Sequence, residues 1–285
     1  VNSGVATVTV ANPAPTIALT SPTSGSSFTA PATVNLAAGV TANGNTITSV
    51  QFYNGSTLLG EDTTSPYSLS WSGVTAGSYS VSARVVYGSG QTVNSGVATV
   101  TVANPAPTIA LTSPATGSSF TAPATVNLAA SVTANGNTIT SVQFYNGSTL
   151  LGEDTTSPYS LSWSGVTAGS YSVSARVVYG SGQTVNSGVA TVTVANPAPT
   201  IALTSPTSGS SFTAPATVNL AASVTANGNT ITSVQFYNGS TLLGEDATSP
   251  YSLSWSGVTA GSYSVSARVV YGSGQTVNSG VATVT

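Results

Sequence analysis

The feature that most constrains this chain is a repeat with a period of 92 residues. The decapeptide VNSGVATVTV occupies residues 1–10, 93–102 and 185–194, and the last nine residues, 277–285, begin a fourth copy. A unit of this length that recurs almost unchanged indicates a tandem array, because about 90 residues suffice for one small hydrophobic core. The array therefore matters more to the fold than any single residue.

The position of the decapeptide sets the phase of the array. Its alternation of Val with Thr is typical of a β-strand, and it stands at the end of each unit. We therefore predict three domains, at 11–102, 103–194 and 195–285. Residues 1–10 are then an orphan final strand of a preceding repeat, which a window cut from a longer array explains. The alternative is that they insert into a neighbouring chain as a donor strand.

Within a repeat, apolar residues alternate with Ser and Thr in short runs, and Gly, Pro and Asn separate the runs. No segment has a helical period. In the second repeat the expected strands are 108–112, 125–132, 139–145, 149–152, 159–163, 171–179 and 183–194. Seven short strands with frequent turns predict an all-β, antiparallel Greek-key sandwich.

The same pattern gives three local expectations for the second repeat. Phe144 and Trp163 are expected to be the largest members of the core between the sheets. The Asn146-Gly147 dipeptide predicts a type I′ hairpin, because that turn needs positive φ at both central residues. Residues 153–158 are expected to form a loop.

Three stretches of the second repeat carry a family resemblance: TIALTSPATGSSFTAPATVNLAASV at 108–132, TSVQFYNGSTLLGEDTTSPYSLSW at 140–163 and AGSYSVSARV at 168–177. They resemble bacterial immunoglobulin-like domains, which occur in tandem in surface adhesins and attached to secreted glycoside hydrolases. The resemblance covers all three repeats and implies immunoglobulin-like sandwiches. It also implies tyrosine corners, at Tyr79, Tyr171 and Tyr263. Unlike antibody domains, the chain has no Cys pair.

The chain contains few residues that could carry out catalytic chemistry. Charged residues make up 3% of the chain, against about 25% in ordinary domains, and there is no His, Cys or Lys. The usual general bases, thiol nucleophiles and Schiff-base amines are therefore missing, and we predict no enzyme activity and no catalytic residue. The net charge of −3 gives no basic surface for nucleic acid, and no apolar run is long enough for membrane insertion.

Metal and cofactor sites are not expected either. Each repeat contains one adjacent Glu-Asp pair, and calcium is the metal whose oxygen ligands such a pair could supply. A plain acidic loop is the preferred interpretation, because no Asp-rich loop of suitable spacing is present. The pairs are Glu61/Asp62, Glu153/Asp154 and Glu245/Asp246.

Two kinds of surface residue remain as candidate sites. Asn54, Asn146 and Asn238 fit the glycosylation sequon, although the hairpin alone explains an Asn-Gly pair. Exposed tyrosines can stack on sugar rings, or instead cover the rim of the core or an interdomain contact. The candidates are Tyr53, Tyr145 and Tyr237 on the outer face of a strand, and Tyr87, Tyr179 and Tyr271 beside a turn.

The connection between units is Ala-Asn-Pro-Ala-Pro, which is stiff and contains no Gly/Ser spacer. We therefore expect the sandwiches to be joined end to end as a rod. The sequence predicts a non-catalytic extracellular array at the cell surface, with an adhesion or spacer role, that forms a rigid stalk or a self-associating filament. Its expected partners are copies of itself, end to end and laterally, and surface glycans. The alternative function is a carbohydrate-binding accessory module of a secreted polysaccharide-active protein.

Overall fold

The structure is a computed structural model that describes residues 4–285, so residues 1–3 of the predicted orphan strand lie outside the described part. The described part is built from strands and turns, without a helix. The strands of the first repeat are β1 Thr16–Ser21, β2 Ser26–Thr29, β3 Ala32–Thr41, β4 Ile47–Asn54, β5 Thr57–Asp62, β6 Tyr67–Val74, β7 Gly77–Tyr87, β8 Gln91–Asn94 and β9 Ala98–Ala103.

The other two repeats reproduce this order with small differences. The strands of the second repeat are β10 Thr108–Ser113, β11 Ser118–Thr121, β12 Ala124–Thr133, β13 Ile139–Asn146, β14 Thr149–Asp154, β15 Tyr159–Val166, β16 Gly169–Tyr179, β17 Gln183–Asn186 and β18 Ala190–Ala195. Those of the third are β19 Thr200–Ser205, β20 Ala216–Thr225, β21 Ile231–Asn238, β22 Thr241–Asp246, β23 Tyr251–Val258, β24 Tyr263–Tyr271, β25 Gln275–Asn278 and β26 Ala282–Val284.

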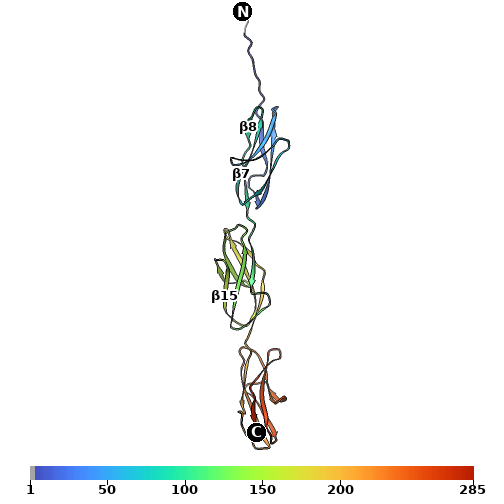
Figure 1. Cartoon of the computed structure of the whole chain (residues 1–285), viewed down its shortest axis with the longest axis vertical. Helices are drawn as coiled ribbons and strands as arrows, with labels where there is room; N and C mark the ends of the chain where they lie inside the picture. The colour runs from blue at the N-terminus through green and yellow to red at the C-terminus, as the bar shows by residue number, and fades with distance from the viewer. Residues whose placement is uncertain (1–3) are drawn as a thin grey trace. The chain divides into compact units, whose positions relative to one another are not determined.

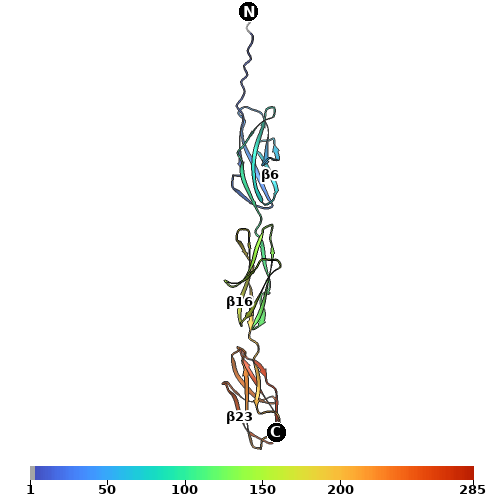
Figure 2. The ribbon, with the colours of Figure 1, turned by 90° about the vertical axis from the view of Figure 1, so that its left-hand side faces the viewer.

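Each repeat consists of two sheets packed face to face (Figure 1, Figure 2). In the first repeat one sheet has the order β1-β3-β6, and the other has the order β2-β9-β7-β4-β5 with β8 also paired to β7. The pairing of β2 with β9 is parallel, whereas the other strand pairs of the repeat are antiparallel. The predicted all-β sandwich is therefore confirmed.

The core forms where the apolar residues of the two sheets meet. Along β3, Val34 and Leu36 are buried while Thr33 and Asn35, which alternate with them, are exposed, as the period of two requires. Phe52 of β4 is fully buried and is the largest side chain of this core. The copy of Phe52 in the second repeat, Phe144, is equally buried, as predicted.

The expectation for Trp163 is wrong, because this side chain is only half-buried. It lies on β15, the edge strand of the sheet β10-β12-β15, so no further strand covers one of its sides. The indole instead packs edge-to-face on Tyr171, with ring centroids 5.1 Å apart and an interplanar angle of 84°. It therefore closes the rim of the core rather than filling its centre.

The single strand predicted for residues 183–194 is two strands, β17 and β18, separated at residues 187–189. Ser187 causes the break. Its backbone N–H donates to the carbonyl of Ala175 (2.8 Å), while its hydroxyl, rather than its carbonyl, accepts the N–H of Ala175 (2.9 Å). The side chain thus replaces one backbone partner of the ladder.

Residues 4–10 repeat the sequence of this strand but belong to no strand, and Val10 is 90% exposed. The copy of Val10 in the first repeat, Val102, is 2% exposed. Insertion of residues 1–10 into a neighbouring chain stays a prediction, as do the domain boundaries at 11, 103 and 195.

Two turn predictions need correction. Positive φ occurs at Gly147 but not at Asn146, so the hairpin has Gly at its first central position, as in a type II′ turn. Two consecutive positive φ values occur instead at Asn135 (49°) and Gly136 (83°), in the turn that follows β12. Glu153 and Asp154 lie in β14 rather than in a loop, because β13 pairs with β14 as far as Asp154.

Candidate functional site

The turn that follows β3, and its copies after β12 and β20, holds the linker that precedes the first strand of the same repeat. In the second repeat, Asn104 donates from Nδ2 to the carbonyl of Gly136 (2.8 Å), and Asn135 donates from Nδ2 to the carbonyl of Ala106 (2.7 Å). Asn137 donates from Nδ2 to the carbonyl of Pro105 (2.7 Å). We call these three hydrogen bonds the linker latch.

The latch recurs in the first repeat, around Asn12, Asn43 and Asn45, and in the third, around Asn196, Asn227 and Asn229, at 2.7–2.8 Å. The turn requires glycine for two reasons: the φ at this position is positive, and the side chain of Asn12 lies close to where a Cβ would be. A Cβ on Gly44 would lie 2.8 Å from Nδ2 of Asn12, at a φ of +82°. The expected strands 125–132 and 139–145 left room for this turn, but its contact with the linker was not predicted.

A polar network covers the outer face of the larger sheet. Gln51 and Tyr53 alternate with the buried Phe52 on β4, so both side chains point away from the core. Arg84 lies directly opposite Gln51 on β7. Its Nε and Nη2 donate to Oε1 of Gln51 at 3.1 and 2.7 Å, and Nη2 also donates to the Tyr53 hydroxyl.

The guanidinium also stacks on an aromatic ring. Cζ of Arg84 lies 4.7 Å from the centroid of the Tyr53 ring, and the corresponding distances in the other repeats are 4.6 Å. The Tyr53 hydroxyl donates to Gln51 Oε1 (2.9 Å), which closes the triangle of the three side chains. The plane of the guanidinium is thereby fixed.

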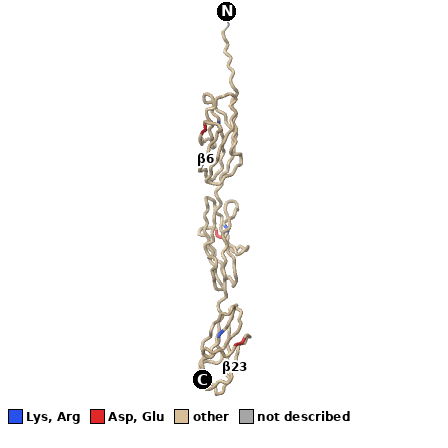
Figure 3. Tube along the Cα trace, turned by 90° about the vertical axis from the view of Figure 1, so that its right-hand side faces the viewer, with Lys and Arg blue, Asp and Glu red and all other residues tan. Residues whose placement is uncertain are grey.

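Glu61 completes the network on the far side of Gln51. Its Oε2 accepts from Ser49 Oγ and from Gln51 Nε2, each at 3.3 Å. The amide of Gln51 therefore connects Glu61 to Arg84, in a repeat whose charged positions are sparse (Figure 3). The hydrogen bonds of Arg84 go to the neutral oxygens of Gln51 and Tyr53.

An open groove of about 470 Å³ lies beside this network. The groove in the second repeat is nearly the same size, at about 460 Å³. The wall contains the stacked Tyr53 and Arg84, and Val97 contributes an apolar side chain that is 64% exposed. The remaining lining residues are Gly55, Ser56, Ser82, Asn94 and Ser95.

The structure thus separates the two sets of candidate tyrosines. Tyr53 and Tyr145 line grooves, and Tyr237 makes the same contacts with its arginine in the third repeat. Tyr87 lies at the end of β7, opposite Ile47, and is not among the lining residues. Tyr179 and Tyr271 end their strands in the same way. A ligand for either set stays a prediction.

The second acidic residue, Asp62, organises the turn after β5. Its Oδ1 accepts the N–H (2.9 Å) and hydroxyl (3.0 Å) of Thr64, and its Oδ2 accepts the N–H of Ser68 (2.8 Å). These bonds, chiefly that from Ser68, hold the pKa of Asp62 below its usual value. In the described chain no three His, Cys, Asp or Glu side chains gather as metal ligands; the expectation of no metal site stays a prediction, as does its alternative, calcium binding beside Glu61 and Asp62.

The sequon asparagine Asn54 is half-buried, and its Oδ1 accepts the N–H of Ser80 (3.3 Å). Glycosylation at Asn54, Asn146 and Asn238 stays a prediction.

The tyrosine corner is present: the Tyr79 hydroxyl donates to the carbonyl of Thr75 (2.8 Å), and Tyr171 and Tyr263 make the same bond.

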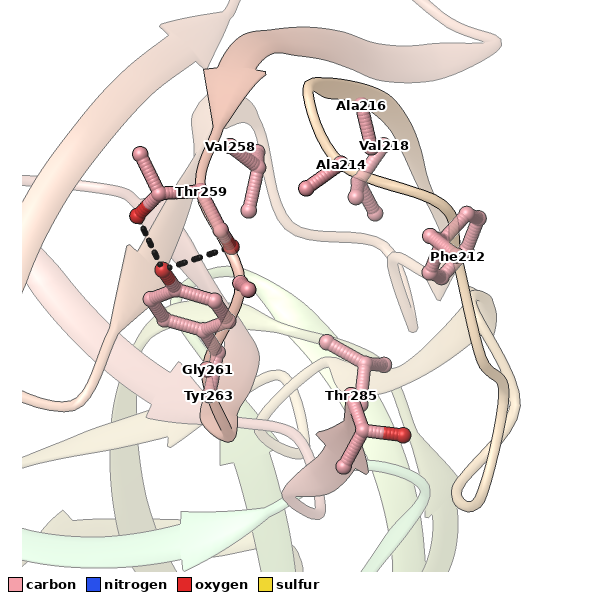
Figure 4. A pocket seen from close by; sticks show the side chains of 11 residues that line it. Phe212, Ala214, Ala216, Val218, Val258, Thr259, Gly261, Tyr263 and Thr285 are labelled. Carbon is pink, nitrogen blue, oxygen red and sulfur yellow. Dashed lines mark hydrogen bonds between the residues drawn. The ribbon is translucent and has the colours of Figure 1, made fainter.

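An apolar cavity of about 190 Å³ lies at one end of the third repeat (Figure 4). Phe212, Val258 and Tyr263 line it, and Phe212 is 40% exposed. In the first repeat Val102 and Ala103 of β9 pair with Phe28 and Thr29 at this place. The cavity therefore corresponds to a strand position of the sandwich.

No helix within residues 4–285 is long and apolar enough to cross a membrane. The family model described as a bacterial Ig domain matches residues 15–83, 107–175 and 199–267. No curated protein matches the chain significantly.

Among solved structures, fibronectin(III)-like modules of Clostridium thermocellum CbhA are similar, with 27% identity over 63% of this chain and 93% of theirs, at a TM-score of 0.30. Immunoglobulin domains 1–5 of Sidekick-1 are also similar, with 17% identity over 97% of this chain and 60% of theirs, at a TM-score of 0.36.

Proposed function

We propose that this chain, which belongs to the bacterial Ig domain family, is a non-catalytic extracellular spacer array. In this role the three repeats set a distance at the cell surface, either as a stalk or as a filament. Membership of the family supports a structural role. The scarcity of charge and the Ser/Thr-rich outer faces support a location outside the cell.

The linker latch is the observation that carries this proposal. A spacer must resist bending at its joints, and a free linker of five residues would bend. Here β9 ends at Ala103, and the side chain of the next residue, Asn104, already bonds to Gly136 of the following repeat. The two prolines of the linker add stiffness because their φ is fixed. Little of the linker is left to act as a hinge.

The expected length follows from strand geometry. Strands of about six residues at roughly 3.3 Å per residue, with turns and linker, give on the order of 35–45 Å per repeat. Three latched repeats would then extend over roughly 100–130 Å. Such a length would hold a functional domain well clear of the surface to which the array is anchored.

A stalk and a filament differ in whether the repeats associate sideways. The chain has no Lys, the residue that often protects an exposed strand edge, and its low charge gives weak repulsion between neighbouring arrays. These properties favour lateral association at high concentration. The edge strands of the first repeat, β1 and β6 in one sheet and β2 and β5 in the other, are the surfaces through which it would occur.

Sedimentation velocity tests the proposal and separates its two forms. A stalk sediments as an elongated monomer with a high frictional ratio at all concentrations, whereas a filament grows with concentration. A monomer with the frictional ratio of a compact particle would rule out the spacer role. The test needs no ligand, so it is independent of any binding activity of the grooves.

A carbohydrate-binding role is the second candidate function. The groove beside the stacked Tyr53 and Arg84 is the observation that favours it, because aromatic and polar groups line this groove in the first two repeats and the contact between tyrosine and arginine recurs in the third. The chemistry of this groove allows a more specific statement about its ligand.

A further inference from the structure

We propose that the groove beside Arg84, with its copies beside Arg176 and Arg268, binds the carboxylate of an acidic sugar unit. The array would then attach at several points to one uronic-acid-containing polysaccharide. This activity goes beyond the spacer role and depends on a different surface. Three observations support this binding: the hydrogen bonding of the arginine, the residues that line the groove, and the repetition of the site along the chain.

The arginine is held in place with part of its donor capacity unused. Its Nε and Nη2 donate to Gln51 and Tyr53, which leaves the N–H groups of Nη1 for another acceptor. The Tyr53 ring and the Gln51 amide fix the guanidinium, so little side-chain entropy is lost when a ligand binds. A fixed guanidinium is a suitable donor for a planar carboxylate.

The charge of the arginine is not neutralised by direct contact with the acidic residue of the network. Gln51 stands between them, accepting from Arg84 and donating to Glu61 at 3.3 Å. Glu61 therefore positions the network through the amide and leaves the guanidinium available. Each repeat has one Arg and no Lys, so this groove holds the only cationic side chain of its repeat.

The rest of the lining suits a sugar ring. Ser56, Ser82 and Asn94 offer hydroxyl and amide groups for the ring hydroxyls, and Val97 offers an exposed apolar surface for a C–H face. A volume of about 470 Å³ lies within the range of roughly 300–1,000 Å³ for small-ligand sites. A simple inorganic anion would leave most of these groups unused.

The charge of the whole chain argues against a nucleic acid. One arginine per repeat on a chain of net charge −3 cannot neutralise a run of phosphates. A polysaccharide with isolated carboxylates presents single charges, which matches one arginine per groove. Because the groove recurs with the repeat, weak individual sites can combine on one polymer chain.

Retention of the full chain in affinity electrophoresis tests the proposal, with polygalacturonate in the gel as the acidic probe and dextran as the neutral one. We expect retardation by polygalacturonate, weaker at higher salt, and none by dextran. The triple variant Arg84→Gln, Arg176→Gln, Arg268→Gln should lose at least tenfold in apparent affinity. Single variants should lose less, because two sites remain.

Two further variants keep the test decisive. Val97→Asp with its copies Val189→Asp and Val281→Asp changes exposed positions that the core does not need, and should also abolish retardation. The matched control is Thr33→Asp with Thr125→Asp and Thr217→Asp, which changes the net charge equally but at exposed positions of the other sheet. It should retain most of the binding.

The proposal is overturned by retardation that survives the triple arginine variant, by equal retardation in dextran, or by equal loss in the Thr33 control set. Stronger binding to single-stranded DNA or to dextran sulfate, which carries no uronic acid, than to polygalacturonate would also overturn it. The spacer role is untouched by each of these results, because sedimentation measures it separately.

Discussion

Removing the linker latch of the second repeat should loosen one joint of the array and leave the other unchanged. The perturbation is the triple variant Asn104→Ala, Asn135→Gly, Asn137→Ala. Glycine at position 135 keeps the positive φ of the turn while it removes the amide. The variant loses the three bonds to Gly136, Ala106 and Pro105, of 2.7–2.8 Å.

The size of the effect follows from these bonds. A neutral hydrogen bond contributes about 0.5–1.5 kcal/mol net, so the latch as a whole contributes on the order of 3 kcal/mol. At that value the linker is detached in fewer than about 1% of molecules, since each 1.4 kcal/mol is a factor of about ten in population. Without the latch, detached and attached linkers become comparable in population.

Distances between pairs of spin labels measure this change. The chain has no cysteine, so labels can be placed through Thr57→Cys and Thr149→Cys, at exposed positions of the first two repeats. We expect a narrow distance distribution in the parent chain and a broad one in the latch variant. Labels at positions 149 and 241 span the next joint and should show no broadening. A distribution across 57 and 149 that stays narrow in the latch variant would refute the reasoning.

Three further predictions concern the repeat itself. Tyr171→Phe removes the bond to the Thr167 carbonyl and should lower the unfolding free energy of the second repeat by about 0.5–1.5 kcal/mol in urea titration. Phe144→Ala should cost about 3–5 kcal/mol in the same assay, whereas truncation of the exposed Val189 to Ala should stay within about 0.5 kcal/mol. Bonds from Thr156 and Ser160 lower the pKa of Asp154, so its contribution is complete above the ordinary carboxyl pKa of 3.8 and is lost as pH falls below it. The acid-induced drop in Tm should therefore be smaller in Asp154→Asn than in the parent chain.

The architecture could be predicted from the sequence because it depends on periodicity. The 92-residue period and the alternation in stretches such as 124–133 require a tandem array of β-sandwiches, since each strand must bury one face. The tyrosine corner could be expected from the family resemblance, and it is a local contact, because Tyr171 and its partner Thr167 are four residues apart. Local patterns of this kind need no knowledge of the register between distant strands.

The candidate sites could be predicted only in part, because they depend on register. Gln51 and Arg84 are 33 residues apart and meet only because β4 and β7 pair with those two residues opposite each other. The only feature of the sequence that pointed to this network was the single, outward-facing Arg of each repeat. Asn104 and Gly136 are likewise 32 residues apart, so the latch could not be inferred from the turn alone. Trp163 is half-buried because β15 is an edge strand, which is a property of the sheet order.

If the latches hold the joints, each added repeat lengthens the array by a fixed increment. Small-angle X-ray scattering from arrays of two, three and six repeats measures this increment most directly. The account predicts a maximum dimension that rises linearly, by on the order of 35–45 Å per added repeat. Growth closer to the square root of the number of repeats, as for segments joined by flexible linkers, would contradict it.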